Sequence, residues 1–503
     1  MTDTARARRT RPEGFPENGP APELIRSGFE LENADAAFLH HGLNLADVAH
    51  VLDLSRRGLV PPEACRTLLA LLLEVVDIAP EEFPYDPVHG EPYNSRERYF
   101  VSRIGDTAGW LHAGRPRREA ARIALRLHLR RQLARLVVDT VAAGLTMVDR
   151  AEEHAETLLP DQTYLQQAQP STFGHYLLSF AYSVVRDSRR LLDELGWISR
   201  SPGGAGCVNG TRLLDDRDPI ADALGFDDVI PHTRDAMWQV DALIHVLAST
   251  ASLLSNFSKL AEDLEIFSSS EFDFVDLADG YSRSSILMPQ KRNPYALAII
   301  RGASGVMIGR LTGFLAVTKS PSARSDNLIF AYGEVPRALD LAQRITTLTG
   351  GVVATLSVNA ERMRDELDRG YTQATDLAEH LVQRLGVDYR SAYVVVGNTV
   401  RQAARDGVPG SAITGEMVDA QALRHTGRSW GLAGTDLSAV LDPQQIVATR
   451  RAEGGAAPDA VAAMVRDLRA DLGTLADEAS ARLAAFETVE ADLLGRARDA
   501  LRT

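Results

Sequence analysis

Apolar residues recur three and four positions apart over long stretches of this chain, with polar residues between them. In residues 119–156, for example, they include Ile123, Leu127 and Leu133. This spacing puts apolar side chains on one face of an α-helix. The same pattern returns in residues 174–198, 238–267, 295–317 and 332–353. It predicts five long helices in the middle of the chain, which we expect to pack as a bundle.

Strand signals are nearly absent from the sequence. Strict alternation of apolar and polar residues, which is typical of half-buried strands, is rare. The pair Asn209-Gly210 lies in a glycine-rich loop rather than between two apolar runs, so it does not indicate a hairpin. We therefore predict an all-α protein. Some of the long helices are apolar on more than one side, which indicates burial against other subunits of an oligomer.

The length of 503 residues suggests about three domains. We predict an N-terminal helical domain at residues 24–118, a central long-helix domain at 119–365 and a C-terminal helical domain at 366–503. Residues 1–23 are basic and proline-rich, and they lack the apolar stretch of a secretory signal. We predict that they form a disordered lead-in.

Composition narrows the range of partners and compartments. The net charge of −14 argues against nucleic acid as a partner, although a local arginine cluster can still bind a small anion. No apolar run is long enough to cross a membrane. The two cysteines, Cys65 and Cys207, fit a reducing cytosol better than a disulfide framework, so we predict a cytoplasmic protein. No cluster of metal-binding side chains has the spacing of a metal site.

Four segments rich in polar residues, glycine or proline interrupt the helical pattern. They are LHAGRPRRE (111–119), QTYLQQAQPSTFGH (162–175), SPGGAGCVNGT (201–211) and SRSSILMPQKRNP (282–294). The last combines serines with a lysine and an asparagine. A serine becomes a base only if its alkoxide is stabilised, and a lysine and an asparagine can support a carboxylate on which negative charge builds. Removal of a proton from the carbon next to a carboxylate needs a stabilised base and also support for the negative charge that builds on the carboxylate. A basic surface loop whose serines cap the following helix is the alternative interpretation.

The segment SSILMPQKRNP resembles the signature loop of the fumarase/aspartase superfamily, whose members release fumarate from succinyl compounds. The closer similarity is to argininosuccinate lyases, and it extends from about Leu24 to the C-terminus. It includes LHAGRPRRE, QTYLQQAQPSTFGHYLL, SPGGAGCVNGT, YTQATDLAEHLV and LDPQQIVATRRAEGGAAPDAV. The resemblance implies an all-α homotetramer with a central helical bundle. It also implies active sites assembled from loops of three subunits, and no metal or organic cofactor.

Several residues match the functional positions of that family. Arg117 matches an arginine near the succinyl carboxylates. Thr163, Gln166 and Gln169 match the second segment, and Lys291 and Asn293 match the signature loop. The catalytic base is a serine of this loop. Two residues, Ile286 and Leu287, separate Ser-Ser from Met-Pro where the family has one, so the match falls on Ser285 or on Ser284; we favour Ser285.

Other positions depart from the family. Tyr164 stands where the family has a histidine discussed as the proton donor, and Ala298 stands where that histidine's glutamate partner is expected. Arg118 replaces an asparagine and adds positive charge to the first segment. A recognition motif that helps to hold argininosuccinate would fall in SARSDNLIFAYGE, where Arg324, Ile329 and Tyr332 replace its tyrosine, glutamine and lysine. A tyrosine ordinarily titrates near pKa ~10, so Tyr164 is either a modified acid or a group that positions substrate.

Together, these features predict a carbon–nitrogen lyase that acts on a small polycarboxylate. It would eliminate fumarate from an N-substituted aspartate, reversibly, by a serine-initiated anti elimination through an aci-carboxylate intermediate. The departures point away from argininosuccinate. An ethylenediamine-disuccinate-lyase-like activity is one fit, and a secondary-metabolite lyase that acts on an N-succinyl intermediate is another. The first alternative is argininosuccinate lyase itself, with divergent recognition residues. The second is a non-catalytic structural relative, against which the retained serine, lysine, asparagine, arginine and threonine argue.

Overall fold

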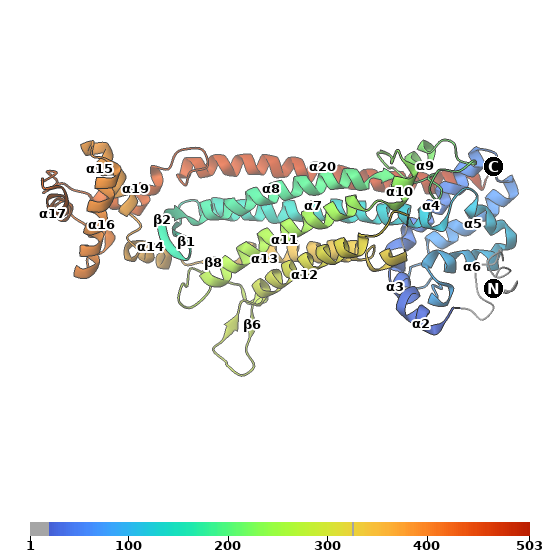
Figure 1. Cartoon of the computed structure of the whole chain (residues 1–503), viewed down its shortest axis with the longest axis horizontal. Coiled ribbons are helices and arrows are strands. Elements are labelled where there is room, and N and C mark those ends of the chain that lie inside the picture. The colour runs from blue at the N-terminus through green and yellow to red at the C-terminus, as the bar shows by residue number, and fades with distance from the viewer. Residues whose placement is uncertain (1–19, 324–325, 503) are drawn as a thin grey trace.

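The computed structural model describes residues 20–323 and 326–502. The predicted lead-in, residues 1–23, lies almost wholly outside this part of the chain, and so does Arg324. The molecule is elongated, with long helices along its middle, the N-terminal helices at one end and a smaller group of helices at the other (Figure 1). The fold is all-α, as predicted from the helical periodicity. No helix in the described ranges is both long and apolar enough to cross a membrane.

The five long helices predicted from apolar spacing are all present. They are α7 (Arg117–Glu153), α8 (Phe173–Ile198), α11 (Asp241–Phe267), α12 (Tyr295–Thr318) and α13 (Glu334–Thr355). Each lies within a few residues of its predicted range. Their buried faces form one continuous apolar core, which includes Leu133, Val137 and Val141 of α7. This core holds the helices side by side along the long axis of the molecule.

Helix α7 begins where the sequence favours a helix start. Pro116 precedes its first residue with an extended backbone, and proline's missing N–H costs nothing at such a position. Glu119 follows in the first turn, where a carboxylate interacts favourably with the positive end of the helix dipole. The residues that predicted this helix, Ile123, Leu127 and Leu133, are all buried. The start of α7 is therefore fixed by local chemistry as well as by packing.

A sixth long helix, α20 (Pro458–Ala500), was not singled out from the sequence. It packs along α7 and α8, and its residues from Val461 to Phe486 contribute to the central core. Its last part, including Leu493 and Ala497, joins the core of the N-terminal helices. The chain therefore ends beside the N-terminal helices (Figure 1). The predicted C-terminal segment, 366–503, accordingly contributes to both ends of the molecule, and the domain boundaries stay a prediction.

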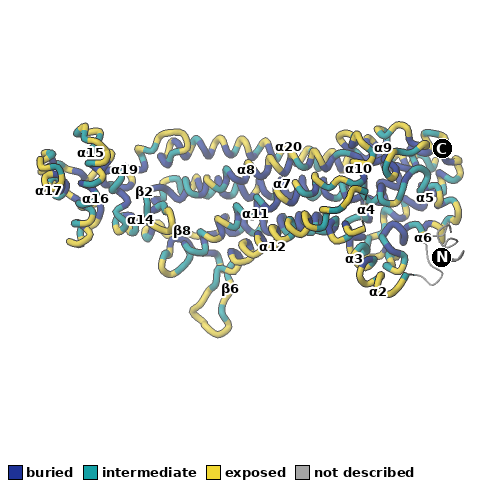
Figure 2. The backbone as a smooth tube through the Cα atoms, in the orientation of Figure 1, coloured by how far each residue is buried: buried dark blue, intermediate teal, exposed yellow. Residues whose placement is uncertain are grey.

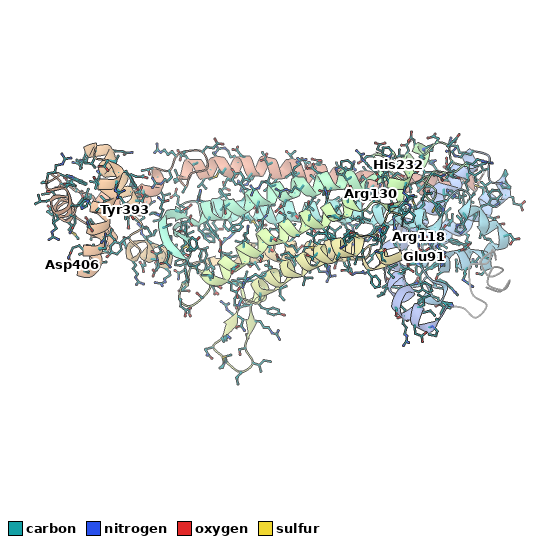
Figure 3. All side chains as sticks on the ribbon, in the orientation of Figure 1. Glu91, Arg118, Arg130, His232, Tyr393 and Asp406 are labelled. Carbon is teal, nitrogen blue, oxygen red and sulfur yellow. The ribbon has the colours of Figure 1, made fainter. Side chains whose placement is uncertain are left out.

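Shorter helices form the two ends. The N-terminal end contains α2 (Pro22–Leu24), η1 (Ile25–Phe29), α3 (Glu30–Asn33), α4 (Ala36–Arg56), α5 (Pro62–Val76), η2 (Pro87–His89), α6 (Pro92–Ile104) and η3 (Gly105–His112). The opposite end contains α14 (Ala360–Arg369), α15 (Ala374–Leu385), α16 (Tyr389–Asp406), η6 (Gly410–Ala412), α17 (Gly415–Thr426), α18 (Ser438–Leu441) and α19 (Pro443–Ala448). Tyr393 and Asp406 mark this second end in Figure 3.

Between the long helices lie α9 (Asp218–Ala223), α10 (Thr233–Trp238), η4 (Asp279–Tyr281) and η5 (Asp326–Phe330). The strands in the described part of the chain are short and form pairs. Antiparallel pairs join β1 (Leu158–Thr163) to β2 (Gln166–Thr172), β5 (Val275–Asp276) to β8 (Ser357–Val358), and β6 (Arg283–Ser284) to β7 (Arg292–Asn293). A parallel pair joins β3 (Arg200–Ser201) to β4 (Asp228–Val229). Two of these pairs, β1–β2 and β6–β7, carry predicted site residues.

A buried ion network ties the N-terminal helices to the residues just before α7. Arg96 donates to Asp47 at 2.8 Å, and Arg115 forms a second ion pair with the same carboxylate. Tyr93 also donates to it, at 2.9 Å. All four side chains are buried. Burial alone would raise the pKa of Asp47, but the two arginines outweigh it and hold the pKa below its usual value. The carboxylate is therefore ionised in the folded protein, and it fixes Arg115 two residues before Arg117.

We expect Asp47→Asn to lower the free energy of unfolding by about 3–5 kcal/mol, because it leaves two buried guanidinium groups without a counter-charge. Denaturant-induced unfolding measures the change. Glu478→Gln is the matched control, since it breaks the exposed pair with Arg189, and it should cost less than about 1 kcal/mol. Equal effects of the two substitutions would show that the network does not anchor this end of the molecule.

Candidate active site

The segment SRSSILMPQKRNP forms a hairpin that projects from the side of the molecule. Strands β6 and β7 pair at its base, and residues 285–291 form its tip (Figure 1). The side chains of Ile286 and Leu287 are 103% and 86% exposed. The extra residue relative to the resembled family thus lies at the tip, where it lengthens the loop without disturbing the strand pair. Residues 286–291 of the tip are exposed, and Ser285 at its start is partly buried (Figure 2).

Hydrogen bonds within this hairpin distinguish the two candidate serines. The hydroxyl oxygen of Ser285 accepts the backbone N–H of Met288 at 3.0 Å, and the Ser285 N–H donates to the Lys291 carbonyl at 3.0 Å. Ser284 lies in β6, in register with Arg292. An N–H that points at a hydroxyl oxygen favours the alkoxide over the neutral form. Of these two serines, only Ser285 has such a donor on its hydroxyl oxygen among the contacts of the described residues.

Lys291 and Asn293 follow on the returning side of the hairpin. Lys291 is exposed at the tip, and Asn293 donates its amide to the Arg283 carbonyl at 3.3 Å. Arg292 bridges Asp276 and Asp279, which fixes the base of the hairpin to the preceding turn. The exposed lysine can turn towards a substrate. The asparagine amide supports the strand pair through its bond to Arg283, and its second N–H can still donate to a substrate.

Arg117 and Arg118 are the first two residues of α7. Figure 3 labels Arg118, at the N-terminal end of the molecule. Arg117 donates to the side chain of Asn94 at 3.0 Å and forms an ion pair with Glu91. Arg118 forms an ion pair with Asp326, whose side chain is largely exposed. Both guanidinium groups are half-exposed, so they can exchange these partners for substrate carboxylates.

Glu119 connects this pair of arginines to the glycine-rich loop 201–211, a role that the sequence did not indicate. Its carboxylate accepts the N–H of Gly204 at 2.8 Å and the N–H of Gly206 at 2.7 Å. Both glycines adopt left-handed backbone conformations, with φ of 70° and 63°. A Cβ on Gly206 would lie 2.6 Å from the Gly210 carbonyl oxygen, so only glycine fits there. Burial raises the pKa of Glu119 to about 7, although the two glycine hydrogen bonds and the charge of Arg115 act to lower it.

Most of the segment QTYLQQAQPSTFGH belongs to a strand hairpin, and its last three residues begin α8. Thr163 pairs with Gln166 across a two-residue turn made of Tyr164 and Leu165. Both turn residues have positive φ, 54° and 58°. Such turns normally contain Asn-Gly or Gly, because other residues are strained there. Tyr164 is 100% exposed, and Thr163, Gln166 and Gln169 are exposed as well. The hairpin presents its polar groups and the tyrosine outward.

Ala298, at the position where the resembled family has a glutamate, lies on the exposed side of α12. Its methyl group cannot orient or polarise any proton donor. No group of three or more His, Cys, Asp or Glu side chains in the described ranges is arranged to hold a metal ion.

The predicted site residues form three separate groups within one chain. The arginines lie at the start of α7, whereas the hairpin with Thr163, Tyr164 and Gln166 follows its end (Figure 1). Helix α7 has 37 residues, so at 1.5 Å per residue it separates these groups by roughly 55 Å. The serine hairpin projects between the two ends. A single chain therefore brings residues together within each group but does not bring the three groups together.

Comparisons with known proteins agree on one family. Residues 57–309 match the family model described as lyase, and residues 371–448 match the model described as argininosuccinate lyase C-terminal. The argininosuccinate lyase of Methanoculleus marisnigri is 34% identical over 427 residues, which cover 84% of this chain and 86% of that protein. The matches span the central helices and both ends of the molecule.

Solved structures are similar over nearly the whole chain. The crystal structure of EDDS lyase in complex with formate is 28% identical, with a TM-score of 0.84, and covers 96% of this chain and 97% of its own. A variant of EDDS lyase with bound fumarate is 27% identical, with a TM-score of 0.84, and covers 100% of both chains. These similarities extend over the hairpins as well as the long helices.

We expect Glu119→Gln to loosen the loop 201–211, because an amide cannot accept both glycine N–H groups and turns its own N–H₂ towards one of them. An unsatisfied buried donor costs about 1–3 kcal/mol. Hydrogen exchange should become faster in this loop, and the free energy of unfolding should fall. Glu74→Gln, which removes an exposed pair with Arg103, is the control and should leave the exchange unchanged. Unchanged exchange in Glu119→Gln would mean that Arg217, which donates to the Gly203 carbonyl, holds the loop instead.

Proposed function

We propose that this chain, which belongs to the argininosuccinate lyase family within the fumarase/aspartase superfamily, uses Ser285 to initiate fumarate release from an N-substituted aspartate. The chain is a fumarate-releasing carbon–nitrogen lyase by its family. The family resemblance and the enzyme class predicted from the sequence are thus confirmed. The substrate, the mechanism and the roles of single residues are the content of the proposal. Its main support is the backbone N–H of Met288 that points at the Ser285 hydroxyl oxygen.

In the proposed reaction, the Ser285 alkoxide removes the proton from the carbon next to a succinyl carboxylate. The electrons move onto that carboxylate as an aci-carboxylate, which Lys291 and Asn293 stabilise. The carbon–nitrogen bond then breaks on the opposite face, which releases fumarate and an amine that gains a proton. One preorganised donor to such a charge contributes roughly 10²–10³ in rate. Arg117, Thr163 and Gln166 would hold the carboxylates of the succinyl portion.

The separation of the residue groups along α7 supports a site that several copies of the chain share. The exposed side of α12 is the surface that favours such an assembly. Ile299, Val306 and Ile308 are 40–52% exposed, and space is open around Gly302 and Gly305. Apolar and small residues on one helix face allow close packing against another helix. We therefore propose a homotetramer with each active site built from three subunits, as the sequence resemblance implies, and a cytoplasmic location.

Two candidates remain for the amine portion of the substrate. The names of the sequence relatives favour argininosuccinate, and they support it better than they support an altered amine. The substitutions Tyr164 and Ala298 favour a different amine, because they remove the histidine–glutamate pair expected of argininosuccinate lyases. The EDDS lyase structures are similar to this chain, which is consistent with the second candidate.

The serine assignment is tested in the reverse direction. We expect the wild type to join fumarate to at least one amine, detected as an N-succinyl adduct by mass spectrometry. Ser285→Ala should lower kcat by about 10²–10⁴, the usual contribution of a catalytic base. Ser284→Ala and Ser282→Ala, in the same segment, should each lower it by less than about tenfold. The opposite ranking of Ser284 and Ser285 would move the base to Ser284. Absence of any adduct, together with absence of fumarate binding, would favour the non-catalytic alternative.

The identity of the amine is tested with the double variant Tyr164→His/Ala298→Glu, which restores the histidine and the glutamate expected in the family. If the present site is adapted to another amine, this double variant should gain at least about tenfold in argininosuccinate cleavage relative to wild type, because an imidazole with a carboxylate partner titrates near neutrality. Fumarate release, followed by ultraviolet absorbance, measures it. Tyr164→Phe is the control for loss of the hydroxyl alone. A wild type that already cleaves argininosuccinate efficiently, with no gain in the double variant, would make argininosuccinate the substrate.

A further inference from the structure

The tip of the β1–β2 hairpin has little support within the hairpin itself. A β-bulge interrupts the strand pairing, because Asp161 pairs with Gln169 whereas the next residue, Gln162, pairs with Gln167. Beyond this bulge, two residue pairs remain before the strained turn. Polar strands specify their register weakly, and a slip of one residue turns every side chain to the other face. The tip therefore needs a contact outside the hairpin to fix its register.

Helix α14 provides such a contact. It packs against β1 (Figure 1), and its residue Leu367 joins Leu158 of β1 in a small apolar cluster at the base of the hairpin. Closer to the tip the contact is polar, because the amide of Gln167 donates to the carboxylate of Glu366 at 3.1 Å. Within residues 163–167, all of them described, Gln167 is the one whose side chain forms a hydrogen bond with another element.

The carboxylate of Glu366 is held so that one oxygen serves the hairpin. Its Oε1 atom pairs with Arg362 at 2.6 Å and with Arg369 at 2.8 Å, whereas its Oε2 atom accepts from Gln167. Arg362 is fixed in turn, because it donates to two backbone carbonyls of the loop after α11, each at 3.1 Å. The arginines therefore fix the orientation of the carboxylate, which presents Oε2 to the hairpin in one place.

Gly370 closes the space on another side of the Gln167 side chain. A Cβ at Gly370 would collide with Oε1 of Gln167, so a larger residue there would displace this side chain. The same oxygen is buried without a hydrogen-bond partner. An unpaired buried polar atom in a folded protein indicates a constraint on the side chain that carries it. Here the constraint is that the amide must turn its N–H₂ group towards Glu366.

We propose that Glu366 is a positioning residue, which acts through Gln167 and holds the tip of the hairpin in the register that the reaction needs. The inference rests on the proposed function, in which Thr163 and Gln166 hold carboxylates of the succinyl portion. Both of these side chains are exposed, so the backbone of the tip decides where they lie. A small displacement of groups that position a substrate lowers its binding and its rate of reaction.

The test uses fumarate, which every candidate substrate releases, so it does not depend on the identity of the amine. Glu366→Gln should weaken calorimetric binding of fumarate to the intact protein by at least about tenfold, because hydrogen bonds to a charged ligand are lost. The two arginines retain the oxygen of the new amide, so its N–H₂ group would face the N–H₂ group of Gln167.

Two further variants accompany this measurement. Gly370→Ala displaces Gln167 without changing Glu366, and it should weaken fumarate binding by a similar factor. Asp365→Asn is the matched control, because this carboxylate lies next to Glu366 on α14 but is exposed. It should bind fumarate as the wild type does.

Reversing the polarity of the contact separates positioning from a general loss of structure. Gln167→Glu alone places two carboxylates against each other, and it should weaken fumarate binding by at least about tenfold. In Gln167→Glu/Glu366→Gln, the amide on α14 donates to the carboxylate on the hairpin, so the affinity should return to within about threefold of wild type. Hydrogen exchange in residues 162–167 should become faster in each single variant and return to the wild-type rate in the double variant.

Wild-type fumarate affinity in both Glu366→Gln and Gly370→Ala would overturn the proposal. A double variant that binds fumarate no better than its two parents would overturn it as well. Failure of the proposed function is distinguishable, because fumarate binding would still depend on Glu366 while no amine was joined to fumarate. A wild type that binds no fumarate would overturn both, and hydrogen exchange would then show whether the contact supports the hairpin alone.

Discussion

The unbroken hydrogen bonding of α7 is the constraint on which the organisation of this molecule depends. A continuous helix of 37 residues without an internal proline behaves as a stiff rod. It therefore fixes how far the arginines at one end lie from the hairpin at the other. The buried Asp47 network holds one end in place, and the core shared with α8, α13 and α20 holds the rest. Chemistry that needs both ends must take them from different copies of the chain.

The sequence predicted the long helices well because each buries a broad apolar stripe that repeats with helical spacing. Helix α20 was not singled out from the sequence, although Leu468, Leu472 and Leu475 on its buried face have helical spacing. Alanines interrupt this stripe at Ala460, Ala479 and Ala497, and alanine marks a stripe only weakly. The β1–β2 hairpin was not predicted from the sequence for a different reason. Its strands are polar, and its turn is Tyr164-Leu165, whereas hairpins are recognised by Asn-Gly or glycine at those positions.

The types of residue in the site could be predicted from short motifs, but their partners could not. In the sequence, Ser284 and Ser285 are both candidates for the catalytic base. In the structure they differ, because the backbone N–H of Met288 donates to the hydroxyl oxygen of Ser285. Glu119 meets two glycines that follow it by 85 and 87 residues, a contact that no local pattern encodes.

The left-handed turn at Tyr164 and Leu165 bears on any effort to make this protein more robust. Each non-glycine residue in that conformation is strained by on the order of 1–3 kcal/mol. Selection for heat resistance alone would therefore favour Asn-Gly at this turn, which relaxes the backbone and removes two exposed side chains. The most thermostable variants from such a selection would be those in which Tyr164 had been replaced. Because Tyr164 is a proposed site residue, such a selection should measure catalysis together with stability.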